Sequence, residues 1–434
     1  MAPRRESDES PGSPPPFLYQ GMLFPFILIV VCFAAWGVAA NMTDPLVKVF
    51  SKIFSMSTLQ ASLVQFSYYG AYFCLALPAA FVNRRFSYKT GILLGLGLAT
   101  AGAFLFYPAS QAMTFGFFLA ALFALAGGLS ILETSANPFV LAMGPDENAT
   151  RRLNFAQAFN PVGTNIGVFL AATLILPSLG AADAAARAVM DPATLRALQA
   201  GELQAVMVPY VGLAVALMGI WIAIALTRMP MGQQAHGAAG DSIDFVPTVR
   251  RLVANRHYRF GVIAQFFNVA AQTCTWTFTI QYVMDAIGGN EADAGVILQY
   301  SLLVFLVSRF AMTWLMGYVR PSRLLAVTGL AGAAFAAGAA VFPGYAGVVL
   351  LVAISACLSL MFPTIYGIAL EGLGDDTKFG AAGLVMAILG GALVPLAQGA
   401  SIDTYGAAAS YCVPATCFLV VFAYAVFDLK TRPN

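Results

Sequence analysis

Three ionisable side chains interrupt long apolar runs of this sequence. Glu133 lies in ILETSANPF, Asp44 in WGVAANMTDP and Arg309 in SLLVFLVSRFAMTW. A charge at the centre of a bilayer is unfavourable by roughly 2.5 to 3.5 kcal/mol on insertion scales, so something must offset this cost. Burial favours the protonated form of a carboxyl group, which can then take up and release a proton. Asp44 and Glu133 are therefore candidate proton-coupling residues.

Other roles remain open for these three residues. Each carboxyl group could instead have a fixed hydroxyl, amide or arginine partner and serve helix packing, and Asp44 could lie at the membrane interface. Arg309 does not lose its proton, so it needs an anionic partner, a carbonyl group or a water-lined cavity. A structural role for Arg309 and contact with substrate hydroxyl groups are both compatible with the sequence.

Amide and indole side chains occur in the same apolar runs. Each sugar hydroxyl both donates and accepts hydrogen bonds, and amides supply the complementary groups. An indole ring can also pack on the CH face of a sugar. The candidate substrate-binding residues from these segments are Trp36, Asn41, Asn137, Gln157, Asn160, Gln272 and Trp276. Asn137 lies one helical turn from Glu133 on the same face, whereas Trp276 could also be an ordinary packing residue.

Composition identifies the environment in which these groups must work. The 434 residues are 59% hydrophobic and 10% charged, against about 25% charged in soluble proteins, which indicates a polytopic membrane protein in a lipid bilayer. A net charge of +2 without a basic arm gives no reason to expect a nucleic-acid partner. Six cysteines in apolar segments show no metal-binding or disulfide spacing. We therefore expect no metal and no cofactor.

The apolar runs predict an all-α integral membrane protein with twelve transmembrane helices. A span needs about 20 apolar residues, and the expected spans are 22–47, 60–82, 90–108, 114–142, 154–177, 207–228, 258–284, 293–318, 324–343, 347–370, 379–400 and 407–428. They divide the chain into two six-helix bundles, 21–228 and 258–428. A cytoplasmic linker, 229–257, joins the bundles, and cytoplasmic tails occupy 1–20, which we expect to be disordered, and 429–434. The outer loop 178–206 could carry a short surface helix.

The distribution of basic residues predicts the orientation. With the N-terminus inside, the outer segments hold only Lys48, Lys52, Arg187 and Arg196, and all other Lys and Arg except Arg309 are cytoplasmic. By the positive-inside rule both termini are therefore cytoplasmic. The turns NRRFSYKTG and YVRPSRLLA, after spans 2 and 8, indicate a weak internal repeat. Repeats of this kind are typical of transporters with a substrate site between the two halves.

Eight segments in order resemble the major facilitator superfamily, and within it the fucose:proton symporter family. They are WGVAANMTDP, FSYKTG, ETSANPF, RLNFAQAFNPVG, AQFFNVAAQTCTW, SRFAMTWL, FPTIYGIAL and LGDDTKFGAAGLVM. The resemblance implies two bundles rocking about a central sugar site in a bacterial inner membrane. It also implies that Asp44 and Glu133 are the proton-coupling and substrate-linked acids. Asn41, Gln157 and Asn160 look like sugar contacts, with Trp36, Trp276 and Arg309 as lesser candidates.

Two positions depart from the family pattern. Phe362 stands where the family has a tyrosine before PTI, so one hydroxyl contact is missing, and Tyr366 one turn further on could replace it. Arg84 stands where the superfamily usually has an aspartate in the loop after span 2, although the fucose family is itself degenerate there. The Phe362 departure leaves the identity of the sugar open.

The sequence thus predicts a proton-coupled symporter, acting as a monomer, that imports L-fucose or a related monosaccharide by alternating access. A glucose/galactose-type hexose carrier, sodium-coupled or a uniporter, is the main alternative. A membrane enzyme using Asp44 and Glu133 as a carboxyl pair would need two acids that share a proton, and no nucleophile with a nearby base is present. A drug exporter would be expected to have a more apolar and aromatic cavity.

Overall fold

The computed structural model describes residues 15–43, 50, 53–54, 58–175, 187, 189–229, 245–288 and 290–432. Within these ranges the regular structure is helical, without any β-strand. Ten helical segments in the described residues are long and apolar enough to cross a membrane. The other two predicted spans correspond to α3 and to α11 with α12, in which amide and hydroxyl side chains lower the hydrophobicity.

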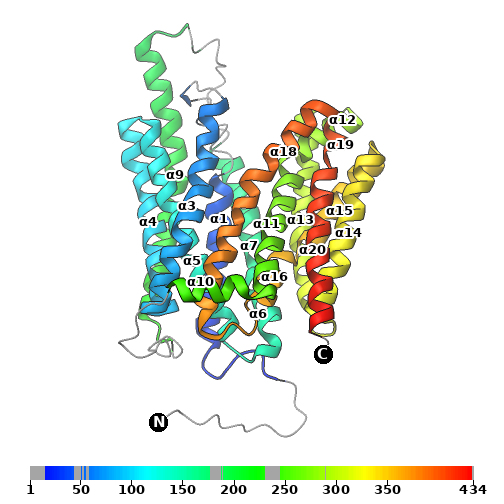
Figure 1. Cartoon of the computed structure of the whole chain (residues 1–434). Helices are drawn as coiled ribbons and strands as arrows, with labels where there is room; N and C mark the ends of the chain where they lie inside the picture. The colour runs from blue at the N-terminus through cyan, green and yellow to red at the C-terminus, as the bar shows by residue number, and fades with distance from the viewer. Residues whose placement is uncertain are drawn as a thin grey trace.

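The helices of the first half of the chain pack against one another. They are α1 (Leu23–Thr43), α3 (Thr58–Arg85), α4 (Tyr88–Ala112), α5 (Phe115–Ala142), η1 (Asp146–Asn148), α6 (Ala149–Gln157), α7 (Phe159–Leu170), η2 (Ala171–Ile175) and α9 (Pro192–Leu226). Figure 1 shows these helices side by side as the first bundle, with α1 close to α7 and α4 close to α5.

The second half forms the other bundle. Its helices are α11 (Arg256–Thr277), α12 (Thr279–Ile287), α13 (Glu291–Leu315), α14 (Pro321–Val341), α15 (Tyr345–Leu358), α16 (Met361–Leu370), η5 (Gly374–Asp376), α17 (Thr377–Met386), η6 (Ala387–Leu389), α18 (Gly390–Tyr405), α19 (Ala407–Ser410) and α20 (Cys412–Thr431). The start of α1 and the end of α20 lie at the same end of the molecule in Figure 1, here called the termini side. The predicted all-α architecture is confirmed.

Proline residues place breaks and free carbonyl groups inside the predicted spans. Pro161 has no N–H for the carbonyl of Gln157, and the fifth span breaks between α6 and α7. Pro138 likewise releases the carbonyl of Thr134 inside α5, where the side-chain amide of Asn83 donates to it at 3.3 Å. The amides of neighbouring helices therefore satisfy backbone groups that proline would otherwise leave unpaired.

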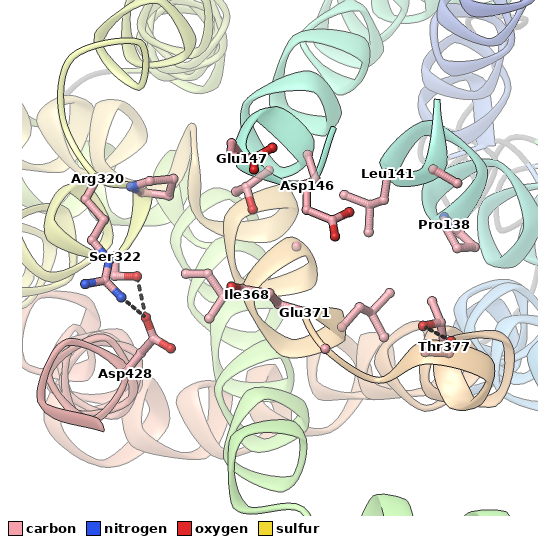
Figure 2. Close-up of a pocket in the computed structure, with 18 of the residues that line it drawn as sticks. Pro138, Leu141, Asp146, Glu147, Arg320, Ser322, Ile368, Glu371, Thr377 and Asp428 are labelled. Atoms are coloured by element: carbon pink, nitrogen blue, oxygen red, sulfur yellow. Dashed lines mark hydrogen bonds and ion pairs between the residues drawn. The ribbon is translucent and has the colours of Figure 1, made fainter. Parts of the chain in front are cut away.

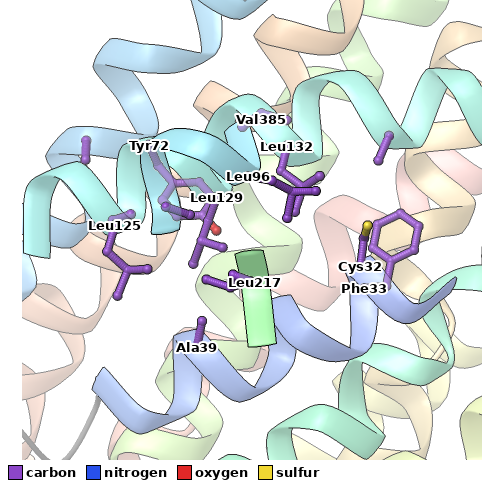
Figure 3. Close-up of a cluster of buried hydrophobic side chains, with 14 of the residues drawn as sticks. Cys32, Phe33, Ala39, Tyr72, Leu96, Leu125, Leu129, Leu132, Leu217 and Val385 are labelled. Atoms are coloured by element: carbon purple, nitrogen blue, oxygen red, sulfur yellow. The ribbon is translucent and has the colours of Figure 1, made fainter. Parts of the chain in front are cut away.

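The buried apolar side chains form two clusters, and the first one extends across the boundary between the bundles. Figure 3 shows part of it: Leu96 and Leu132 from the first bundle lie near Val385 of α17. Tyr366 and Phe379 of the second half also belong to this cluster, whereas the second cluster lies within the second half. The two bundles are therefore packed together through α16 and α17.

A helix that the sequence did not predict crosses the termini side. The linker, predicted as 229–257, contains α10 (Phe245–Ala254), which lies across the other helices in Figure 1. Its Phe245 packs on Phe81 of α3 and on Phe379 of α17, with ring centroids 5.3 Å and 5.5 Å apart. Arg251 binds the carboxylate of Asp376 at 2.7 Å. The linker thus contacts both bundles.

The outer loop 178–206 differs from its prediction. Its DPATLRALQAGEL segment forms no separate surface helix, because α9 begins at Pro192 and runs for 35 residues into the sixth span. Asp191 caps this helix by accepting from the backbone N–H groups of Ala193 at 2.9 Å and Thr194 at 3.1 Å, as an N-cap aspartate does. Strong capping and continuous helix-forming residues favour one long helix over two.

Candidate functional site

Glu133 lies in the middle of α5 with 1% of its surface exposed. Neither of its carboxyl oxygens makes a hydrogen bond of regular geometry with a described residue, although the Asn137 side chain approaches the carboxyl group. Two tyrosine hydroxyl groups are within electrostatic range, that of Tyr72 from α3 and that of Tyr366 from α16. An ionised carboxylate without partners is costly in such an environment, so this position favours a bound proton or a ligand that can donate hydrogen bonds.

Asn137 and Gln157 form a buried pair beside Glu133. The Gln157 side-chain amide donates to Oδ1 of Asn137 at 2.7 Å. The two residues are 0% and 2% exposed. Nδ2 of Asn137 keeps a free donor among the described residues. The amides that we predicted as substrate-binding are therefore brought together with Glu133, with hydrogen-bonding capacity to spare.

Arg309 joins the two halves. Its side chain is 4% exposed, and its Nη1 donates to the backbone carbonyl of Gln157 at 3.2 Å. This is the carbonyl that Pro161 releases from the helix. The guanidinium also lies 4.8 Å from the ring centroid of Phe305. Arg309 forms no ion pair with any described residue, so of the three partners considered for it, the structure supplies a carbonyl group.

Trp36 is connected to Glu133 through a residue that the sequence analysis missed. The Trp36 indole N–H donates to the hydroxyl of Tyr72 at 2.6 Å, and Tyr72 interacts electrostatically with Glu133. The available signal was the tyrosine-rich segment QFSYYGAYF, in which Tyr68 stands one turn before Tyr72. Tyr72 was missed because a tyrosine in an apolar helix is usually read as a packing residue.

Asn41 and Asn160 lie at the contact of α1 with α7. Asn41 donates to the carbonyl of Gly37 at 3.0 Å and to the hydroxyl of Thr164 at 2.9 Å. Asn160 donates to the carbonyl of Phe33 at 3.4 Å. Gly37 permits this close approach, because a Cβ atom there would collide with the carbonyl oxygen of Asn160. Both amides are half-buried and also hold helices together. Asp44 lies outside the described residues.

Apart from Arg309 on α13, the predicted residues of the second half lie on α11 and α16. Trp276 donates to Oγ of Ser355 at 3.1 Å and packs edge-on against Phe305 at 5.0 Å. Phe362 stacks on Tyr366 with centroids 6.2 Å apart. Gln272 is half-buried. Two other amides of α11, Gln265 and Asn268, are fully buried with unpartnered side-chain atoms among the described residues. They precede Gln272 on the same helix by seven and four residues.

A cavity of about 630 Å³ opens on the termini side between the two halves (Figure 2). Carboxyl groups line it, from Asp146, Glu147, Glu371 and Asp428, together with Arg320. The predicted site residues do not line it, but Pro138 and Gly367 do, each next in sequence to a residue beside Glu133. Asp428 accepts a hydrogen bond from Ser322 and lies 3.8 Å from Arg320, as Figure 2 shows.

The protein consists of two packed helical bundles, with buried amides, an acid and an arginine near the boundary between them. This arrangement is typical of membrane transport proteins. Residues 26–395 match the model of the Major Facilitator Superfamily, and the chain belongs to that superfamily. The predicted superfamily membership is thus confirmed, and so is the resemblance to the fucose:proton symporters, as the relatives below show. Within the described residues, no group of three or more His, Cys, Asp or Glu side chains could hold a metal ion.

Three curated relatives align along nearly the whole chain. An L-fucose-proton symporter of Haemophilus influenzae is 41% identical over 94% of this chain and 97% of the relative. An L-fucose-proton symporter of Escherichia coli is 35% identical over 95% and 94% of the two chains. A glucose/galactose transporter of Brucella abortus is 33% identical over 94% and 95%. All three are described as transporters, in agreement with the expectation that this chain is not an enzyme.

Solved structures agree with the fold. The crystal structure of FucP, a Major Facilitator Superfamily transporter in the outward conformation, superposes with a TM-score of 0.87 at 35% identity, covering 93% of this chain and 98% of FucP. The proton:xylose symporter XylE gives a TM-score of 0.67 at 12% identity, covering 94% and 95%. The XylE likeness concerns the fold alone. Twelve membrane-spanning helices in two bundles therefore describe this protein.

Proposed function

We propose that this protein is a proton-coupled symporter that imports L-fucose or a related monosaccharide by alternating access. The observation that carries the proposal is the unpartnered, fully buried carboxyl group of Glu133 beside the Asn137–Gln157 pair. The 41% identity to the Haemophilus influenzae L-fucose-proton symporter supports the choice of substrate and ion. Glu133 and Asp44 would be the proton-coupling residues.

The remaining predicted residues would bind the sugar. Asn137 and Gln157 offer amide groups next to Glu133, and Trp36 and Trp276 offer rings for the CH face of the sugar. Arg309 donates to a backbone carbonyl and has an unpartnered Nε. Asn41, Asn160, Gln272 and Phe362 are half-buried and complete the proposed set.

Transport follows from the linkage of the two ligands. With the site open to the outside, a carboxyl group takes up a proton and the sugar binds. With the site open to the cytoplasm, the sugar leaves and the proton follows. Each ligand raises the affinity for the other by the same factor, so the inward proton gradient drives sugar uptake.

The termini side is, in this proposal, the cytoplasmic side of a multi-pass protein in the bacterial inner membrane. Monomeric bundles 21–228 and 258–428 would rock about the site, with 229–257 as linker and 1–20 and 429–434 as tails. Contacts between the bundles at the termini side support an outward-facing state. Asn154 donates to Oγ1 of Thr364 at 3.1 Å, and Arg84 donates to the carbonyl of Asp375 at 3.3 Å.

A glucose/galactose-type carrier is the second candidate. Phe362 favours it, since the hydroxyl group of the fucose family is missing there, and so does the 33% identical Brucella abortus relative. A carrier of this type could use sodium or no ion at all. The identity of the sugar and of the ion can be decided in one assay.

The test is uptake of radiolabelled L-fucose into proteoliposomes with an imposed inward proton gradient. D-glucose, D-galactose and D-mannose serve as unlabelled competitors. We expect fucose to accumulate and to be released when the gradient collapses. Uptake that requires sodium at fixed pH would refute proton coupling, and transport of a competitor but not fucose would refute the substrate.

Glu133→Gln tests the carboxyl group itself. The substitution keeps the volume and removes the titratable oxygen, so accumulation should be abolished while exchange of labelled for unlabelled sugar across the membrane persists. Gln111→Asn is the control, because it alters an exposed amide near the end of α4 that lies outside the predicted set. Undiminished accumulation in Glu133→Gln would overturn the assignment of this residue.

A further inference from the structure

Tyr366 is a second-bundle residue that reaches the acid of the first bundle. Its side chain is fully buried in α16 and interacts electrostatically with Glu133 of α5. The hydroxyl group approaches the Asn137 side chain but makes no hydrogen bond of regular geometry with any described residue. A phenol that could both donate and accept thus lies within electrostatic range of a carboxyl group whose oxygens make no hydrogen bond of regular geometry with a described residue.

The position of Tyr366 depends on closure of the bundles. Thr364, two residues earlier in α16, accepts from Asn154 of α6 at 3.1 Å. Gly367, the next residue, faces Thr150 of α6 so closely that an added Cβ would lie 2.5 Å from the threonine hydroxyl. α16 is therefore pressed against α6, and separating the bundles at the termini side would carry Tyr366 away from Glu133.

Few other titratable groups surround this pair. Among the described residues those facing Glu133 are Tyr72 and Tyr366, and those facing Tyr366 are Glu133, Tyr88 and Tyr258. Tyr72 already accepts from Trp36, and Tyr258 donates to the carbonyl of Gly380 at 3.0 Å. None of these groups in the described part of the chain is a basic side chain, so the protonation state of Glu133 determines what Tyr366 encounters.

We infer that Tyr366 is the positioning residue through which the second bundle senses the charge of Glu133. When Glu133 is ionised, the Tyr366 hydroxyl donates to the carboxylate and holds α16 against the first bundle. A hydrogen bond to an ionised acceptor is roughly twice as strong as one between neutral groups. When Glu133 binds a proton, the bond weakens and the termini side can open.

This inference rests on the proposed function and deepens it. The proton arriving from outside forms an O–H bond on Glu133, and that bond breaks when the proton leaves to the termini side. Tyr366 keeps its own proton throughout. The acid-lined cavity of Figure 2 would receive the departing proton and sugar, since Pro138 and Gly367 in its lining are next to Asn137 and Tyr366. Sugar bound without a proton would be held back.

Tyr366→Phe removes only the hydroxyl and tests the inference. In proteoliposomes, proton-driven accumulation of L-fucose should fall roughly tenfold or more, the factor expected for loss of a hydrogen bond to a charged group. Exchange of labelled for unlabelled fucose should stay within about twofold, because binding and the conformational change persist. Tyr424→Phe is the matched control, since Tyr424 is buried and unpartnered in α20, within the second bundle.

A conformational readout separates sensing from structural support. Spin labels on Glu147→Cys and Arg323→Cys, with Cys74 and Cys412 replaced by serine, report the separation of the bundles at the termini side. In the labelled protein that keeps Tyr366, and with fucose present, the distance between the labels should increase as the pH falls, because more molecules are open at the termini side. The Tyr366→Phe distribution should be independent of pH and contain more open molecules.

Three outcomes decide the inference. Wild-type accumulation and pH response in Tyr366→Phe would overturn it, even if Glu133→Gln abolishes accumulation and so upholds the proposed function. Loss of exchange in Tyr366→Phe with an unchanged pH response would also overturn it, because this result would show that Tyr366 has a purely structural role. Unimpaired accumulation in Glu133→Gln would overturn the proposed function instead. If Tyr366→Phe does not fold, Tyr366→Leu in the same assays decides.

Discussion

Gly367 of α16 lies in close contact with Thr150 of α6, where the two bundles meet on the termini side. An alanine Cβ at this position would lie 2.5 Å from Oγ1 of Thr150 and 3.1 Å from both its Cβ and its Cγ2. Threonine is stiff about χ1, and Gly367 is buried within α16, so neither side can yield easily. Gly367→Ala should therefore destabilise the conformation described here relative to one that is open at the termini side.

The size of the effect can be worked out from this geometry. Overpacking a close contact costs about 1 to 3 kcal/mol, which corresponds to a shift of roughly 5- to 150-fold in a conformational equilibrium. If the outward-facing state becomes the minor one, its population falls by this same factor. The apparent affinity for external sugar should then fall in proportion to that population. Thr150→Ala should reverse part of the shift, since it removes Oγ1 and Cγ2.

The assay is the distance between spin labels at positions 147 and 323, measured without sugar. Gly367→Ala should increase the open fraction, and Gly367→Ala with Thr150→Ala should return it towards the starting value. Gly219→Ala, in α9, is the matched control because a Cβ there meets nothing within 4 Å. An open fraction equal to that of the unaltered protein in Gly367→Ala would refute the steric reasoning.

Two further predictions concern the termini side. Arg152 is fully buried and donates to the backbone carbonyl groups of Val140, Gly144 and Phe17. Arg152→Met should therefore lower the free energy of unfolding by about 3 kcal/mol. The measurement is the thermal midpoint in detergent, and an unchanged midpoint would contradict this role. Burial, and after it the charge of Arg432, hold the pKa of His257 below its usual 6.5, whereas Asp428 acts in the opposite direction. The folded protein therefore binds this proton less readily than the unfolded chain does. The free energy of unfolding should be highest above pH 6.5 and should fall as the pH drops through the folded-state pKa. His257→Gln should lessen that loss in thermal unfolding at two pH values, and an identical loss would show that His257 is not responsible.

Much of the fold was accessible from the sequence because hydrophobic length is a strong signal. The ends of the predicted span 114–142 agree closely with α5, and the two-bundle architecture followed from one polar interruption of the apolar pattern. α9 was misjudged because the membrane boundary was taken as the helix boundary, although a helix continues beyond the bilayer wherever its residues permit. α10 was missed because a ten-residue amphipathic helix lacks the hydrophobic length on which span prediction depends.

The candidate site was accessible only in part. Polar residues in apolar helices stand out, so Glu133, Asn137, Gln157 and Arg309 were found, and the structure brings them together. Which helices meet depends on tertiary packing, so neither the use of a backbone carbonyl by Arg309 nor the approach of Tyr366 to Glu133 could be predicted from spacing. The roles of these residues in transport stay predictions until the variants above are measured.

The hydrogen bond between Arg309 and the carbonyl of Gln157 has a consequence for how the link between the bundles is encoded. Its acceptor is a main-chain oxygen, so no substitution of the Gln157 side chain removes it. That oxygen is available because residue 161 lacks an N–H. The link between the bundles therefore depends on Arg309 and on the proline at position 161, whereas the Gln157 side chain serves the separate contact with Asn137.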